Sequence, residues 1–310
     1  MTASAPLALP PGLTVLERGW LSANNILFDD GPQAATLVDS GYCTHAAQTL
    51  ALVEAALAGK PLTRLLNTHL HSDHCGGNAA LQQRWPQLQT LIPPGQWQQV
   101  QDWDAQALSY EPSGQLCPRF RADGMLQPGS CVRLAGRDWH IHAAPGHDPH
   151  ALLLFEPESG VLISGDALWE NGFGVVFPEI AGDSGFAEVA DTLAVIERLA
   201  PRLVIPGHGP VFGDVPQAIA RARQRLAGFV AAPLKHARYA AKVLLKYKLL
   251  EWQRITQADA LAWLLATPYF CALHQQHFPA HDLRDWALTL MQELIDSGAA
   301  QRQDGWLINL

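Results

Sequence analysis

The sequence contains no run of eighteen apolar residues, although 48% of its 310 residues are hydrophobic. A helix that crosses a bilayer needs about 20 consecutive apolar residues, so no membrane span is predicted. The opening MTASAPLALPPG also lacks the basic start and the sustained apolar run of a signal peptide. We therefore expect a cytoplasmic protein with no membrane partner.

The sequence also lacks any CxxC pair. Its cysteines form an odd, widely spaced set of five: Cys43, Cys75, Cys117, Cys131 and Cys271. Such a set favours reduced thiols over a disulfide framework.

Basic residues are fewer than acidic ones, with 21 Lys+Arg against 29 Asp+Glu and a formal net charge of -8. A chain of this charge would repel phosphate backbones over most of its surface, which argues against a protein built mainly to bind nucleic acid. The imbalance is uneven, because residues 231–310 carry 8 Lys+Arg against 7 Asp+Glu, whereas residues 1–230 carry 13 against 22. We therefore predict two domains, residues 1–230 and residues 231–310.

Histidine and aspartate, by contrast, are concentrated in one short segment. Residues 68–77 read THLHSDHCGG and hold His69, His71, Asp73 and His74 within six positions. The segment follows TRLLNT, a predicted buried strand, so it forms a loop at the end of that strand. Packing does not require this density of imidazole, whereas metal binding does.

The same pattern recurs three times further along the chain. A β-like run ends in glycine with a histidine or aspartate at His147 in PGHD, at Asp166 in SGDALW and at His208 in PGHG. Loops at strand ends are where α/β proteins gather functional groups. We therefore expect these strand ends to converge on one metal site.

Taken together, the HxHxDH segment and the three later ligands resemble the metallo-β-lactamase-fold hydrolase superfamily over about residues 12 to 225. The resemblance implies an αββα four-layer sandwich, in which two mixed sheets pack face to face with helices outside. It also implies a dinuclear site at one edge of the sandwich. Residues 1–230 would then be the catalytic domain.

Residue chemistry supports two ligand sets. His69, His71 and His147 offer three nitrogens, which suit zinc or a similar ion, and Asp73, His74 and His208 offer a mixed set. Asp166 is the predicted carboxylate bridge. We expect two divalent ions, zinc being favoured and manganese or iron also accepted. A water held by both ions would have its pKa lowered to roughly 7 and would attack as bridging hydroxide, with Asp73 as the candidate proton relay.

Within the superfamily, three departures bear on the substrate. Enzymes that open β-lactams usually have Cys or Ser in place of the bridging aspartate, so Asp166 argues against a lactamase. Acyl-homoserine lactonases commonly have a tyrosine three residues later, where this chain has Trp169. Hydroxyacylglutathione hydrolases, the branch that the chain otherwise resembles, have a GHEYT-like segment where this chain reads GHGPVF. Glutathione specificity is thus not implied.

Several other residues in or near these motifs each allow two interpretations of their role. His140 and His142 alternate on a strand and favour packing or a rim position over metal binding. Asp39 favours a supporting or turn role, and Cys75 a small packed side chain. His150 is open between facing the substrate and facing solvent. Five aromatic residues, equally consistent with a pocket or with the core, are Trp97, Trp103, Tyr110, Trp169 and Phe173. Residues 93–128 are expected to be a helical or lid element.

The last eighty residues have a different pattern. Helices are predicted over residues 236–253, 256–268 and 281–298, the second of them capped by Thr256. Asp304-Gly305 then predicts a terminal hairpin. Three helices and a hairpin resemble a winged-helix module, which some superfamily members that cleave RNA also carry. The same module would serve as a dimer contact or as a wall of the substrate pocket.

Three functions therefore remain. The favoured one is a dinuclear metal-dependent hydrolase acting on a small-molecule ester, thioester or lactone. The alternatives are a metal-dependent endoribonuclease or phosphodiesterase, and a non-catalytic metal-containing ligand-binding protein.

Overall fold

The computed structural model describes residues 9–183 and 185–310. Most of the segment on which the absence of a signal peptide was predicted, residues 1–8, lies outside the described residues. Among the residues described, no helix is long and apolar enough to cross a lipid bilayer.

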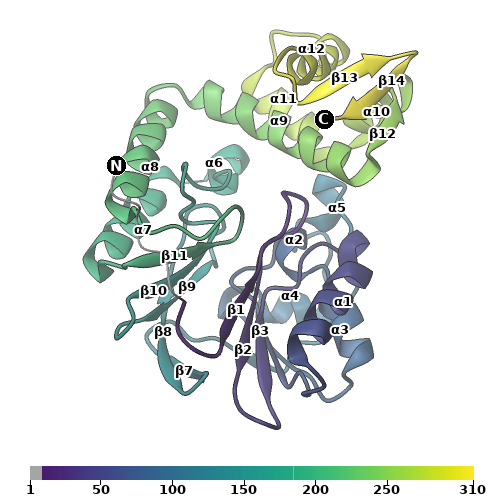
Figure 1. Ribbon diagram of the computed structural model, residues 1–310. Helices are drawn as coiled ribbons and strands as arrows, with labels where there is room; N and C mark the ends of the chain where they lie inside the picture. Colours follow the sequence, from purple (N-terminus) through teal and green to yellow (C-terminus); the bar gives the residue numbers. More distant parts are fainter. Residues whose placement is uncertain (1–8, 184) are drawn as a thin grey trace, which may run out of the picture.

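Two mixed sheets form the centre of the molecule (Figure 1). The first has six strands in the order β1-β2-β3-β4-β5-β6, with β1 to β3 antiparallel and β3 to β6 parallel. Its strands are β1 (Leu13–Leu16), β2 (Asn25–Asp29), β3 (Ala35–Val38), β4 (Arg64–Leu66), β5 (Gln89–Ile92) and β6 (Gly124–Met125).

The second sheet has five strands in the order β11-β10-β9-β8-β7. Its strands are β7 (Cys131–Leu134), β8 (Arg137–Ala143), β9 (Leu152–Glu156), β10 (Val161–Gly165) and β11 (Leu203–Pro206). β10 and β11 are parallel, and β9 is antiparallel to both β8 and β10. β8, β10 and β11 therefore run in the same direction, and their carboxyl ends meet at one edge.

Alternation of side chains along the strands explains why two sheets stack and helices cover them. Ile26, Phe28 and Leu154 belong to the core between the sheets. Leu27, between the first two, faces α1 (Ala46–Leu57) and α3 (Asn78–Arg84). Leu153 faces α7 (Phe186–Leu199) and α8 (Val215–Ala231) in the same way. Strands buried on both faces alternate between two cores, and the predicted αββα sandwich is confirmed.

Residues 93–128 contain short helices, as predicted, followed by the two-residue strand β6. They include a 3-10 turn (Pro94–Gln96), α4 (Trp97–Asp102) and α5 (Tyr110–Ser113). The remaining short elements are a 3-10 turn (Cys43–His45), α2 (Ser72–Cys75) and α6 (Phe177–Ala181).

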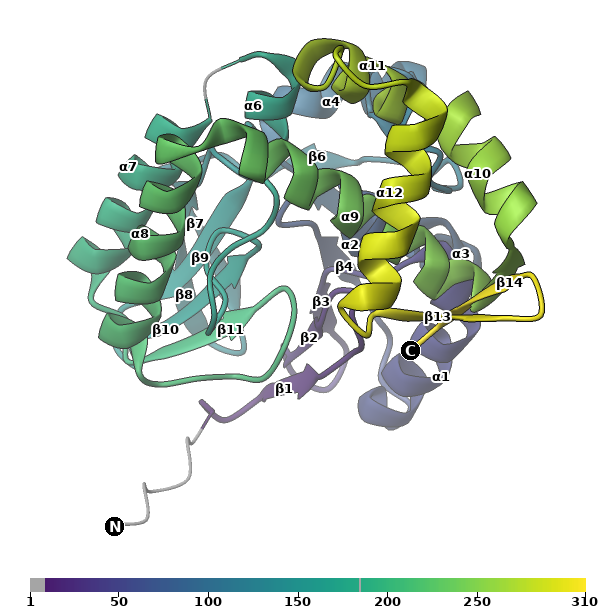
Figure 2. The ribbon, with the colours of Figure 1, turned by 90° about the horizontal axis from the view of Figure 1, so that it is seen from above.

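The C-terminal region lies at one end of the sandwich, with α9 (Pro233–Trp252) leading to it from α8 (Figures 1 and 2). Its other elements are β12 (Arg254–Thr256), α10 (Gln257–Ala266), α11 (Pro268–His277), α12 (Leu283–Asp296), β13 (Ala300–Gln303) and β14 (Trp306–Asn309). The predicted cap is present, since the Thr256 hydroxyl oxygen accepts from the Asp259 amide at 3.1 Å. The predicted hairpin is present too, and Asp304 and Gly305 have positive φ.

Two elements of this region were not predicted. The helix expected over residues 256–268 is α10, which ends at Ala266. The unpredicted α11 begins at Pro268, whose ring restricts Thr267 to an extended conformation. β12 has three residues and pairs with β14, which makes a three-stranded sheet in the order β12-β14-β13. The region has a core of its own. Its description as a winged-helix domain of residues 231–310 stays a prediction.

Candidate metal centre

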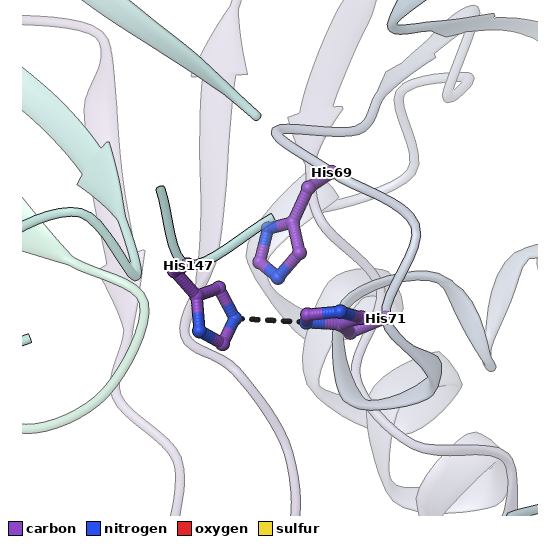
Figure 3. A group of neighbouring side chains, drawn as sticks. All are labelled: His69, His71 and His147. Carbon is purple, nitrogen blue, oxygen red and sulfur yellow. Dashed lines mark hydrogen bonds between the residues drawn. The ribbon is translucent and has the colours of Figure 1, made fainter. Parts of the chain in front are cut away.

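His69, His71 and His147 come together from two loops. His69 follows β4, His71 precedes α2, and His147 lies between β8 and β9. One ring nitrogen of each lies within 4.8 Å of the others. Figure 3 shows the three rings pointing toward one another, with His71 Nδ1 at 2.8 Å from His147 Nε2. The sequence expectation that these histidines converge is thus met in the structure.

Asp73, His74, Asp166 and His208 form a second group, with one ligand atom of each again within 4.8 Å of the others. His208 Nε2 lies 3.0 Å from Asp73 Oδ2. The short helix α2 holds Asp73 and His74, and the ends of β10 and β11 deliver Asp166 and His208. All seven predicted ligand residues therefore lie in two adjacent groups.

Asp166 stands between the groups. Its Oδ2 atom lies 3.4 Å from His147 Nε2, in the first group. Its Oδ1 atom lies 3.4 Å from His74 Nε2, and Oδ2 lies 3.8 Å from His208 Nε2, in the second group. The Asp166 carboxylate thus lies close to nitrogens of both groups.

Electrostatics in the first group favour neutral imidazoles. Burial, and then the neighbouring rings of His74 and His71, hold the pKa of His69 well below its usual value. Burial and His71 lower the pKa of His147 to about 4. A neutral imidazole keeps a lone pair, which is the form that binds a metal.

The second group is dominated by its carboxylates. Burial alone would lower the pKa of His74, but Asp166 and Asp39 more than offset it and raise that pKa well above its usual value. Burial alone would raise the pKa of Asp166, but His74 and His208 hold it well below its usual range. This group therefore carries negative charge that attracts a cation or a proton.

The residues present fit a pair of cations. The Nε2 atoms of His69 and His74 are buried without a hydrogen-bond partner among the described residues, which is unusual for buried nitrogens unless something else binds them. Nitrogen and carboxylate donors in these numbers suit zinc, manganese or iron. Glycine is required close by, because a Cβ at Gly174 would overlap the His147 ring.

Hydrogen bonds on the side away from the metal centre orient the ligand side chains. Asp39 Oδ2 lies 2.8 Å from His74 Nδ1 and accepts from the Thr68 hydroxyl at 2.8 Å, which is the position that the predicted supporting role requires. The Val175 carbonyl accepts from His147 Nδ1 at 2.6 Å. Each contact leaves the Nε2 atom of its histidine directed at the centre.

Asp39→Asn is accordingly expected to weaken metal binding by about 10- to 100-fold without removing a ligand, because it takes away the charge behind His74. The measurement is metal affinity by competition with a chromophoric chelator. Asp138→Asn is the matched control, since Asp138 is 61% exposed and pairs with Arg133 on the far hairpin. Equal affinities in the two variants would contradict the supporting role of Asp39.

The structure also places the other residues that lie close to the ligands in the sequence. His140 and His142 lie on β8 and belong to neither group, as predicted. Cys75 is buried, as predicted, and its Sγ lies 3.8 Å from Cys117 Sγ, a proximity that spacing did not reveal. Gly77 allows a close approach of this loop to the residues after β3, because a Cβ there would lie 2.4 Å from the Ser40 carbonyl oxygen.

A cavity of about 560 Å³ opens onto both groups. Of the five aromatic residues left open by the sequence, Trp169 lines it, whereas Trp97, Trp103, Tyr110 and Phe173 belong to the core. Trp169 also donates its indole N–H to Asp166 Oδ1 at 3.1 Å. His150 lines the cavity as well.

Sequence reasoning missed two contributions to this cavity. Trp20 stacks on the His208 ring at 5.4 Å although it is 57% exposed, and no motif marks it. The C-terminal region supplies a wall made by Tyr239, Val243, Leu244, Tyr247 and Tyr269. Of the roles open for that region, the wall is therefore realised.

Comparison with known proteins agrees with this geometry. The family model described as "Metallo-beta-lactamase superfamily" matches residues 18–208. The chain belongs to this superfamily. The matched segment includes all seven residues of the two groups.

Curated relatives of the superfamily include proteins called hydroxyacylglutathione hydrolase. One, from Synechococcus sp. (strain JA-3-3Ab), is 31% identical over 170 residues, which cover 53% of this chain and 57% of the relative. Another, from Nostoc sp., is 30% identical over 172 residues, covering 53% and 58%. The chain thus spans little more than half the length of these relatives.

Solved structures resemble the whole chain in fold. A metallo-beta-lactamase family protein from Thermus thermophilus has a TM-score of 0.59 at 20% identity, covering 98% of this chain and 100% of that one. A beta-lactamase domain protein from Burkholderia ambifaria has a TM-score of 0.58 at 24% identity, covering 98% and 94%. The fold, including the C-terminal region, therefore recurs in these two proteins.

Proposed function

We propose that this protein is a metal-dependent hydrolase that acts on a small ester, thioester or lactone. The observation that carries the proposal is the place of Asp166, whose two oxygens face the nitrogens of both groups at the end of a cavity. His69, His71 and His147 would hold one divalent ion, and Asp73, His74 and His208 the other, with Asp166 between them. When bound, such ions activate water and polarise a carbonyl oxygen.

Other steps of the proposed reaction depend on the chain's own residues. Asp73 lines the cavity and pairs with His208, so it is suited both to binding a cation and to relaying a proton during turnover. Trp169 holds the Asp166 carboxylate through its indole N–H. The cavity walls would exclude bulk water around the reacting carbonyl, which strengthens every polar interaction there.

Two observations support a carbonyl compound as the substrate. Relatives over about half of the chain bear the name hydroxyacylglutathione hydrolase, which describes hydrolysis of an acyl compound. Furthermore, the described residues that line the cavity include no lysine or arginine, the side chains that commonly pair with the phosphates of a nucleic acid. This observation speaks against the nuclease alternative. A cytoplasmic location, homodimer formation and contact with nucleic acid stay predictions.

Elemental analysis of the purified protein, together with a hydrolysis panel, tests the proposal. We expect close to two ions per chain and turnover of carbonyl substrates from p-nitrophenyl esters, acyl thioesters and lactones. Removal of metal by a chelator should abolish that turnover, and added zinc or manganese should restore it.

The other outcomes each favour a different function. Cleavage of bis-p-nitrophenyl phosphate or short RNA without turnover of carbonyl substrates would favour the nuclease. Two ions with no turnover on any substrate class would favour a non-catalytic ligand-binding protein. A single iron, or no metal, would contradict the dinuclear proposal.

A further inference from the structure

The peptide group between Val175 and Val176 lies between two buried histidines. Its carbonyl oxygen accepts from Nδ1 of His147 at 2.6 Å, and its N–H donates to Nε2 of His236 at 3.0 Å. No cis peptide bond occurs among the described residues, so this group is trans and planar, and its C=O and N–H point in opposite directions. Holding the N–H in place therefore directs the carbonyl at His147.

The residues on either side of this peptide group are held by the metal centre itself. The Gly174 N–H donates to the Asp166 carbonyl oxygen at 2.9 Å. The Phe177 ring packs on the His147 ring at 5.6 Å between centroids. His236 lies on α9 and belongs to neither ligand group. The orientation of the peptide group between these two anchored residues therefore depends on a side chain from outside the centre.

His236 is suited to accept this hydrogen bond. It is 2% exposed, and its ring packs on Phe186 at 5.1 Å and on Phe229 at 4.8 Å between centroids. An apolar side chain would fill this site without burying a polar ring, so the contact with the Val176 N–H explains why a histidine is present. Burial, and then the charge of Arg225, lowers the pKa of His236 to about 4, so the ring is neutral at pH 7 and Nε2 keeps its lone pair.

We propose that His236 is a positioning residue for the metal centre, which acts on His147 through the Val175–Val176 peptide group. By accepting the N–H, it directs the carbonyl so that His147 carries its proton on Nδ1 and keeps Nε2 free for an ion. The hydrogen bond to His236 also polarises the peptide group and makes its carbonyl a stronger acceptor. The proposal rests on the role of His147 as a metal ligand in the proposed function.

The first measurement uses the metal-free protein, so it depends neither on catalysis nor on metal loading. Two-bond 15N–1H NMR correlations of the imidazole rings report which nitrogen of His147 carries the proton, and the spectrum of His147→Gln assigns its signals. We expect the Nδ1–H tautomer in the native protein and in His236→Gln, whose amide oxygen can accept from Val176. His236→Phe and His236→Leu fill the same space without an acceptor, and each should give a mixture of both tautomers.

Zinc affinity, measured by competition with a chromophoric chelator, is the second measurement. His236→Phe should weaken the binding of one zinc ion by about tenfold, the lower end of the effect of losing a residue that contacts a ligand directly. The second ion should be affected less, because its proposed ligands Asp73, His74 and His208 make no printed contact with the Val175–Val176 peptide group. His236→Gln should retain most of the native affinity for both ions.

Leu249→Ala is the matched control, because Leu249 is buried in the same helix and lies about 20 Å along it from His236. It should lower the melting temperature, as a substitution that creates a cavity does, and leave the tautomer and the zinc affinity unchanged.

Three outcomes would overturn the proposal. They are a single Nδ1–H tautomer of His147 in His236→Phe and His236→Leu, an equal loss of zinc affinity in Leu249→Ala, and a His236→Gln protein as impaired as His236→Phe. Native protein that binds no zinc would instead contradict the proposed function, and the tautomer measurement would still decide the role of His236.

Discussion

Asp166→Ala is expected to lower kcat/KM by at least about a hundredfold and to reduce the metal content of the purified protein. The reason is its position, because no other carboxylate reaches nitrogens of both groups at 3.4 Å among the described contacts. Steady-state kinetics with the best carbonyl substrate and elemental analysis are the measurements. Loss of metal and loss of rate should occur together.

Asp138→Ala is the control for this variant, since Asp138 is exposed on β8 and its ion pair with Arg133 is worth at most about 1 kcal/mol. It should keep both metal and rate. An Asp166→Ala protein with two ions and undiminished kcat/KM would refute the bridging role.

Gly207→Ala is expected to lower kcat/KM by about a hundredfold although it removes no ligand. A Cβ at this position would lie 2.3 Å from Asp166 Oδ1 and 2.8 Å from His74 Cε1, so both side chains would have to shift. Misplacement of a catalytic group by about 1 Å can cost about two orders of magnitude in rate. Kinetics and metal content, measured on protein that retains its far-ultraviolet circular dichroism, give the result.

Gly228→Ala provides the matched control in α8, where a Cβ would meet nothing within 4 Å. It should leave activity unchanged and raise the free energy of unfolding by about 0.5–1 kcal/mol, because alanine loses less backbone entropy in a helix. If Gly207→Ala behaved like Gly228→Ala, the centre would tolerate a methyl group and the close approach would have no role.

The seven residues of the centre could be predicted because their signal is local. Each lies in the segment that follows a strand, and strands that run in one direction deliver their ends to one edge. The HxHxDH segment needs no knowledge of tertiary structure to stand out. Asp39 could be assigned a supporting role for the same reason, since it directly follows β3, which pairs with β4.

The cavity could not be predicted in the same way. Trp103 packs against Tyr110 and Phe120 within the core, whereas Trp169 and Tyr269 line the cavity. Core and pocket aromatics have the same composition, so only the tertiary arrangement separates them. α11 and the three-residue β12 were missed because their elements depend on Pro268 and on pairing with β14 rather than on periodicity.

The division of the cavity between two stretches of chain has an evolutionary consequence. All seven residues of the centre lie within residues 18–208, whereas Tyr239, Tyr247 and Tyr269 enclose the opposite side from beyond residue 230. Mutations in the last quarter of the gene can therefore change what the protein accepts without disturbing how it reacts. Descendants of one ancestral hydrolase can diverge in substrate while the shared segment stays recognisable, so likeness within that segment indicates the class of reaction more than the individual substrate.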